Sequence, residues 1–77
     1  MSLKRSLHPM PEDVLLALEL AGLMQAYSDR PAYQQNDYIG WIARAKRPAT
    51  RQKRLSQMLA ELESGLKYMG MQYHAKR

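Results

Sequence analysis

Hydrophobic residues recur at helical spacing along most of the chain, and prolines and glycines divide this pattern into segments. The first segment begins at Pro11, which suits the first helical position and is followed by two acids that favour the positive end of a helix dipole. Helix-forming residues fill positions 14–20, and Gly22 is expected to end or bend this helix. Residues 23–27 then predict a further turn or a short second helix.

The second segment predicts a helix that begins between Pro31 and Asn36 and runs to about Lys46. Four of its residues fall at i, i+3, i+4 and i+7 and therefore share one face: Tyr38, Trp41, Ile42 and Ala45. We expect Tyr38 and Trp41 to be structural residues that anchor the core, because their face is otherwise apolar. The alternative is an open aromatic platform on which a nucleobase or a ligand ring stacks.

The third segment begins at Pro48, which can open a helix but does not fit inside the preceding one. An apolar row then repeats at helical spacing: Leu55, Met58, Leu59, Leu62 and Leu66. Gly65 is typical of a helix end. Residues 67–77 show no clear period and predict an irregular tail, part of which can pack on the helices.

These segments predict an all-α fold, a small compact bundle of three to four helices with an irregular C-terminal tail. With 77 residues the chain has the size of one domain. We expect a flexible arm over residues 1–9, a helical domain over residues 10–66 and the tail over residues 67–77. No repeat, low-complexity run or strand is predicted.

The first predicted helix is apolar on more than one side. One group of its residues faces one way and a second group faces another: Val14, Leu18 and Ala21, then Leu16, Leu20 and Leu23. Two arrangements account for this pattern. Either the helix is central and wrapped by the others, or it leaves a hydrophobic patch for a partner protein or a second copy of the chain.

The net charge of +5 is concentrated around the break between the second and third segments. Residues 44–54 contain six cations and no acid, whereas residues 1–30 sum to −1. Five of these cations form a candidate site for an anionic partner, named here the basic junction: Arg44, Lys46, Arg47, Lys53 and Arg54. Nucleic acid or another polyanion would bind there through its charge, without sequence readout. The alternative is ordinary solvated charge.

Arg51, the sixth cation, falls inside the apolar arc of the third helix, one turn before Leu55. We therefore expect it to be a structural residue, partly buried and hydrogen-bonded. Capping the free carbonyl groups at the end of the preceding helix would be a natural role.

The residues give little support to catalysis. The chain has no cysteine, which excludes disulfides, thiolate catalysis and cysteine-ligated metals. His8 falls in the expected arm and His74 in the expected tail, and no metalloprotease, Asp-x-Asp or glycine-rich phosphate motif is present. We predict no catalytic residue, no metal ligand and no cofactor. The chain is therefore expected not to be an enzyme.

Acids interrupt the apolar stretch near the N-terminus. Glu12 and Asp13 precede it and Glu19 divides it, which disfavours both a signal peptide and a transmembrane span. We therefore expect a cytoplasmic protein.

One stretch resembles a known signature. Residues 38–46, with Thr50-Arg51 and Arg54-Leu55, resemble the Tyr-x-x-Trp-Ile-x-x-Ala-Lys…Thr-Arg-x-x-Arg-Ile/Leu pattern of the bacteriocin-protection, YdeI- or OmpD-associated family. The similarity extends over roughly residues 9–66. It implies a small helical domain of bacterial origin, a loose association with envelope stress and protection against antibacterial peptides, and no established enzymatic activity.

We therefore predict a small non-enzymatic binding or adaptor module. It would use the basic junction against an anionic partner, or the apolar first helix against another protein or a second copy. A nucleic-acid-binding accessory protein is the alternative, and an envelope-stress factor is the third hypothesis.

Overall fold

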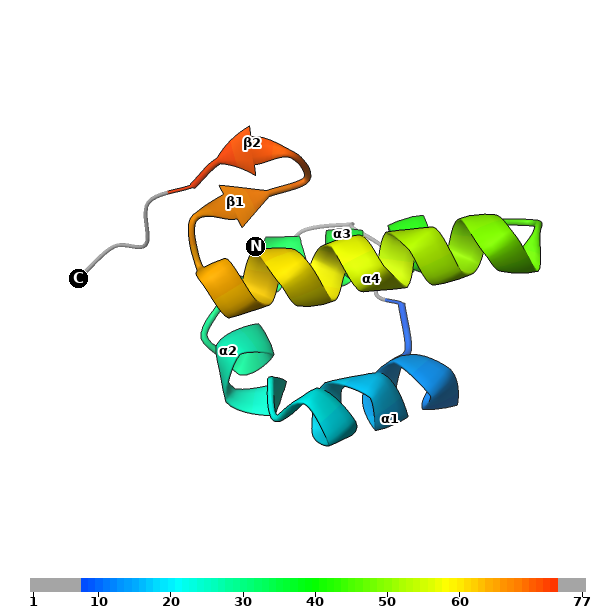
Figure 1. Ribbon diagram of the computed structural model, residues 1–77, viewed down its shortest axis with the longest axis horizontal. Helices are drawn as coiled ribbons and strands as arrows, with labels where there is room; N and C mark the ends of the chain where they lie inside the picture. The colour runs from blue at the N-terminus through cyan, green and yellow to red at the C-terminus, as the bar shows by residue number, and fades with distance from the viewer. Residues whose placement is uncertain (1–7, 74–77) are drawn as a thin grey trace, which may run out of the picture.

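The computed structural model describes residues 8–73, which form four helices and a small hairpin (Figure 1). The predicted arm is thus described only at its last two residues, and residues 74–77 of the tail, with His74, lie outside the described part. The elements follow in this order: α1 (Glu12–Ala21), α2 (Met24–Ser28), α3 (Ala32–Ala43), α4 (Pro48–Ser64), β1 (Lys67–Tyr68) and β2 (Met71–Gln72).

The helix boundaries follow the prolines and glycines. Pro48 occupies the first turn of α4, where its missing N–H group costs no hydrogen bond. Gly22 and Gly65 end α1 and α4 in the left-handed conformation, with φ of 71° and 73°. The helical prediction is therefore confirmed, including the short second helix.

The expectation of a small, compact and mostly helical domain is confirmed, but the tail is not irregular throughout, because part of it forms a small sheet. β1 and β2 pair antiparallel, with Lys67 opposite Gln72 and Tyr68 opposite Met71. The two turn residues between them, Met69 and Gly70, have positive φ of 52° and 81°. Positive φ at both positions matches the right-handed twist of a two-residue hairpin turn.

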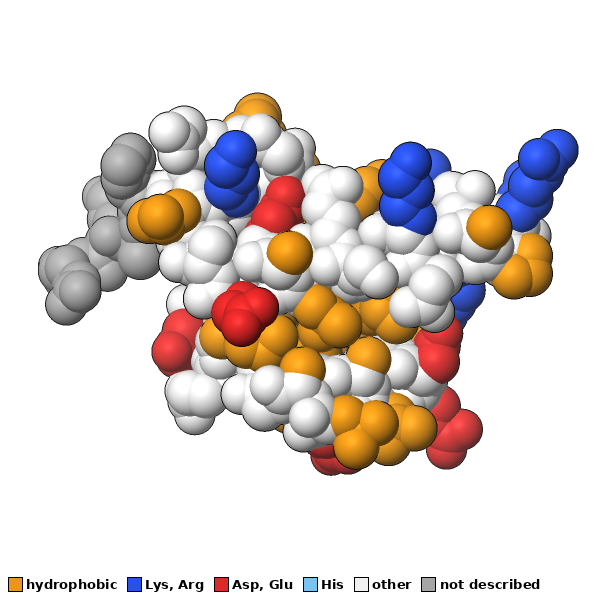
Figure 2. Space-filling model, in the orientation of Figure 1, with side chains coloured by type: hydrophobic (Ala, Val, Ile, Leu, Met, Phe, Trp, Pro, Cys, Tyr) orange, Lys and Arg blue, Asp and Glu red, His pale blue; other side chains and the backbone are white. Residues whose placement is uncertain are grey.

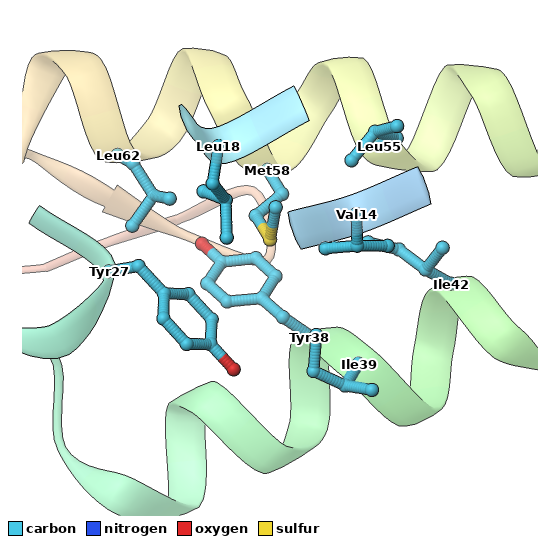
Figure 3. Packing of buried hydrophobic residues seen from close by; sticks show 9 residues of the cluster. All are labelled: Val14, Leu18, Tyr27, Tyr38, Ile39, Ile42, Leu55, Met58 and Leu62. Atoms are coloured by element: carbon cyan, nitrogen blue, oxygen red, sulfur yellow. The ribbon is translucent and has the colours of Figure 1, made fainter. Parts of the chain in front are cut away.

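The core is centred on α4, which contacts α1, α2, α3 and β1. It consists of nine buried residues that come from every helix: Val14, Leu18, Tyr27, Tyr38, Ile39, Ile42, Leu55, Met58 and Leu62. The Tyr38 ring extends from α3 into the middle of this cluster (Figure 3). Trp41 and Leu59 are half-buried against it. Leu66 does not join the apolar row, because α4 ends before it and its side chain remains exposed.

α1 lies at the edge of the fold and is not the central helix. Val14 and Leu18 are fully buried, whereas Leu16 and Leu20 are 56% and 80% exposed. Of the two arrangements considered, the structure therefore has the one that leaves hydrophobic side chains uncovered. Within residues 8–73, no helix is both long and apolar enough to cross a membrane.

Candidate functional site

The basic junction occupies the end of α3, the connecting loop and the first turns of α4. α3 ends at Ala43, three residues before its predicted end at Lys46. The N–H group of Ala45 bonds to the carbonyl oxygen of Ile42 at 3.2 Å, so the carbonyl oxygen of Trp41 has no partner from the helix backbone at its usual i+4 position. The chain then continues to Pro48, where α4 begins. Four cationic side chains of the basic junction are exposed: Arg44, Lys46 and Arg47 before α4, and Lys53 within it.

Arg54 does not share the exposure of the other four cations. Its Nη1 donates a hydrogen bond of 2.7 Å to the carbonyl oxygen of Trp41, and its guanidinium carbon lies 5.3 Å from the centre of the Trp41 ring. A cation over an aromatic face is attracted by the ring quadrupole. Arg54 therefore caps α3 and covers one side of Trp41, so the hypothesis of an open aromatic platform does not fit this geometry.

Arg51 also contacts the end of α3, through a hydrogen bond of 3.4 Å from Nη1 to the carbonyl oxygen of Ile42. Its other nitrogens donate to both carboxylate oxygens of Asp13, at 2.9 and 3.0 Å. The hydrogen bond from Arg51 holds the pKa of Asp13 below its usual value. With side chains 30% and 52% exposed, this ion pair is screened by solvent and adds little to stability. Asp13 lies 38 residues earlier in the chain, and no sequence pattern indicated it as the partner of Arg51.

Charge is separated across the described residues. From residue 8 to residue 29 the chain carries four acids and no Lys or Arg: Glu12, Asp13, Glu19 and Asp29. Figure 2 shows blue side chains projecting upward over the hairpin and α4, and red side chains around α1, with further red ones near the hairpin and α4. Among residues 8–73, the ion pair found beside the basic junction is that of Arg51 with Asp13. Within residues 8–73, the four exposed cations therefore have no acid paired to them.

A buried polar cluster that the sequence analysis missed lies at the other end of α4. The carboxylate of Glu61 accepts hydrogen bonds from Tyr38 Oη at 2.5 Å, from the N–H groups of Met69 and Gly70 at 2.8 and 2.7 Å, and from Gln57 Nε2 at 3.1 Å. Glu61 thus holds the hairpin turn against α4. The only sequence signal was an acid beside Leu62 in the apolar row.

The electrostatics of this cluster follow from its contacts. Burial disfavours the charged form of Glu61, but its four hydrogen bonds outweigh burial and hold the pKa below the usual value. Burial, together with the bond to Glu61, raises the pKa of Tyr38 well above its usual value. Tyr38 therefore remains a protonated donor, and Glu61 remains an ionised acceptor whose oxygens are occupied by groups of the protein.

Arg30 completes the buried cluster from the connection before α3. Its Nη2 donates to the carbonyl oxygens of Glu61 and Lys67 at 3.0 and 2.9 Å, and its Nη1 donates to Gln34 Oε1 at 3.1 Å. Its guanidinium carbon lies 4.5 Å from the centre of the Tyr73 ring. Arg30 therefore joins α3, α4 and the hairpin, which is a structural role.

Residues suited to chemistry are few. His8 lies against α3, where its backbone N–H group donates a hydrogen bond of 2.8 Å to Asn36 Oδ1. Its ring packs on Gly40, since a methyl group at that position would lie 2.7 Å from Nε2. Across residues 8–73 no three His, Asp or Glu side chains are grouped as a metal site would require.

A model of one protein family, described as Bacteriocin-protection, YdeI or OmpD-Associated, matches residues 8–65. The chain belongs to this family. The resemblance inferred from residues 38–55 is thereby confirmed. No curated protein and no solved structure matches the chain.

The family match covers all four helices of this bacteriocin-protection, YdeI or OmpD-associated chain and ends at Gly65. The basic junction and Glu61 lie inside the match. The hairpin that supplies two donors to Glu61 lies beyond it. The buried cluster is therefore built across the boundary of the family match.

Proposed function

We propose that the chain is a small non-catalytic binding module whose basic junction contacts an anionic partner. The observation that supports this proposal is the exposure of Arg44, Lys46, Arg47 and Lys53 with no acid paired to them within residues 8–73. Arg51 and Arg54 join the start of α4 to the end of α3 through hydrogen bonds to its last carbonyl groups. The backbone that carries these cations is thus fixed before binding, which limits the conformational entropy that the chain loses when a partner binds.

Nucleic acid is a candidate partner because phosphate groups bind exposed Lys and Arg side chains without further recognition elements. Each phosphate that a cation neutralises in duplex DNA releases counterions and contributes about 0.9 to the slope of log affinity against log salt. Four cations would give a slope of roughly 3 to 4 if all of them contact phosphates.

Replacing Arg47 and Lys53 together by glutamine is expected to lower the affinity for duplex DNA by at least about tenfold at low salt and the salt slope by about 2. Both side chains are exposed, so the fold should not change. Fluorescence anisotropy with labelled DNA over a series of salt concentrations measures both quantities.

The matched control is Lys67→Gln, which removes an exposed cation from β1, at the opposite end of α4. It should leave the affinity and the slope nearly unchanged. A double variant that binds DNA as tightly as the unmodified chain, or binding that does not depend on salt, would overturn the nucleic-acid proposal. Heparin, measured in parallel, separates a general polyanion site from one that requires nucleic acid.

The description of the family names bacteriocin protection, and we include this role in the proposal as the biological setting of the binding module. A strain that lacks the protein should then survive a bacteriocin challenge less well than the parent strain, as measured by colony counts. The unmodified chain should restore survival and the Arg47→Gln/Lys53→Gln variant should not. Equal survival with and without the protein would contradict this role.

A further inference from the structure

The outer face of α1 carries two exposed leucines, Leu16 and Leu20, with acidic side chains beside them. Val14 and Leu18 face the core. Leu16 and Leu20 each follow one of them by two residues, so they lie about 200° further around the helix and point outward. A shallow depression runs beside them, lined by Glu12, Asp13, Leu15, Leu16 and Glu19. Figure 2 shows hydrophobic side chains flanked by red ones along the lower edge of the molecule, which α1 forms.

The charges around these leucines restrict what can cover them. The four acids of residues 8–29 sum to −4, since no Lys or Arg lies in that range. Asp13 is already paired with Arg51, which leaves Glu12 and Glu19 as exposed carboxylates beside the leucines. A symmetric dimer through α1 would bring these like charges together, which disfavours a second copy on this face.

A second copy that docks its basic junction onto α1 would match the charge but not the apolar surface. The large hydrophobic side chains exposed on the described residues are Leu16, Leu20, Tyr33, Leu66 and Met71, and none belongs to residues 44–54. The occupant must therefore supply both cations and hydrophobic side chains on one surface. An amphipathic helix with lysines or arginines beside leucines meets both requirements.

We infer that α1 is a second docking surface, which binds a cationic amphipathic helix of a partner protein through Leu16, Leu20, Glu12 and Glu19. This surface is separate from the basic junction, and it makes the chain an adaptor with two binding faces of opposite charge. Two leucines and one shallow depression form a small contact, so the affinity belongs to the weak, transient class of interfaces.

The test uses the full chain and a synthetic peptide of leucine and lysine whose leucines fall on one helical face. Binding is measured by fluorescence anisotropy. The double variant Leu16→Gln/Leu20→Gln is expected to weaken binding by about tenfold or more, because it removes the apolar contact. Glu12→Gln/Glu19→Gln is expected to weaken binding and to reduce its salt dependence.

Matched controls lie elsewhere on the same chain. Leu66→Gln removes a leucine that is 59% exposed, and Glu63→Gln removes an exposed acid near the end of α4; both should bind the peptide normally. Circular dichroism of every variant verifies that the fold is retained. The Arg47→Gln/Lys53→Gln variant should also keep peptide binding, so that failure of this inference and failure of the proposed function give different results.

Three outcomes would overturn the inference. The first is equal binding of a peptide with the same composition and scrambled order, which would show that charge alone suffices. The second is an equal loss of binding in Leu66→Gln and in the α1 double variant. The third is sedimentation of the unmodified chain as a dimer that Leu16→Gln/Leu20→Gln dissociates, which would identify a second copy as the occupant.

Discussion

Replacing Glu61 by alanine is expected to lower the free energy of unfolding by about 3 kcal/mol, because it leaves three donors of the hairpin cluster without an acceptor. These donors are the hydroxyl group of Tyr38 and the N–H groups of Met69 and Gly70. A chain of 77 residues has a total stability of only about 4–12 kcal/mol. Urea unfolding followed by circular dichroism measures the loss, which should approach complete unfolding at the lower end of that range.

Glu63→Ala is the matched control, since Glu63 lies two residues further along α4 and is exposed. It should change stability by less than about 0.5 kcal/mol. The pH dependence provides a second signature. Because the pKa of Glu61 is lower in the folded state, its contribution is present above the usual glutamate pKa of about 4.3 and is lost as the pH falls through the folded-state value.

The difference in stability between the unmodified chain and Glu61→Ala should therefore shrink as the solution is acidified below about pH 4.3. Asp13, whose pKa is also lowered, contributes an acid dependence that both proteins share. A difference that stays constant with pH, or a Glu61→Ala variant as stable as Glu63→Ala, would show that the carboxylate does not hold the hairpin.

Replacing Arg30 by methionine is expected to lower the free energy of unfolding by about 2 kcal/mol. Methionine keeps much of the packing but removes every hydrogen bond that the guanidinium donates, and it leaves the buried Oε1 of Gln34 without this donor. The carbonyl oxygen of Glu61 still accepts hydrogen bonds from Ser64 and Gly65, so losing the bond from Arg30 destabilises it less. Urea unfolding again measures the effect.

Arg30→Lys should fall between Arg30→Met and the unmodified chain, at a loss of about 1 kcal/mol, because one ammonium group lacks the planar fork that reaches several acceptors at once. Arg44→Met is the control, as it removes the exposed side chain of the arginine that follows α3. Equal stability of Arg30→Met and Arg44→Met would contradict the structural role assigned to Arg30.

The helices could be predicted because their signals are local. Pro48, Gly22 and Gly65 act through the conformations that their own backbones allow, and the apolar spacing depends on neighbours three or four residues away. The hairpin could not be predicted in this way. Met69 adopts a positive φ that its side chain disfavours, and the carboxylate that holds it there belongs to Glu61, eight residues earlier.

The positive charge of the candidate site could be predicted from the sequence, but which of its cations are exposed and which are hydrogen-bonded could not. A run of cations identifies the basic junction. Only the structure shows that Arg47 is exposed, whereas Arg54 donates a hydrogen bond to the carbonyl oxygen of Trp41. The free carbonyl group itself arises because α3 ends at Ala43, and helix ends are set by tertiary contacts as much as by sequence. Arg30 was missed because it stands in a connection before Pro31, where no period marks its burial.

Glu61 also bears on how members of this family can differ from one another. In this chain the partners of its carboxylate come partly from residues 69 and 70, beyond residues 8–65, which the family model matches. A homologue that has the glutamate but no such hairpin would leave an ionised carboxylate beside the core without these two donors. Substitution at this position and loss of the C-terminal extension are therefore expected to occur together in evolution, so that the two features covary across family alignments.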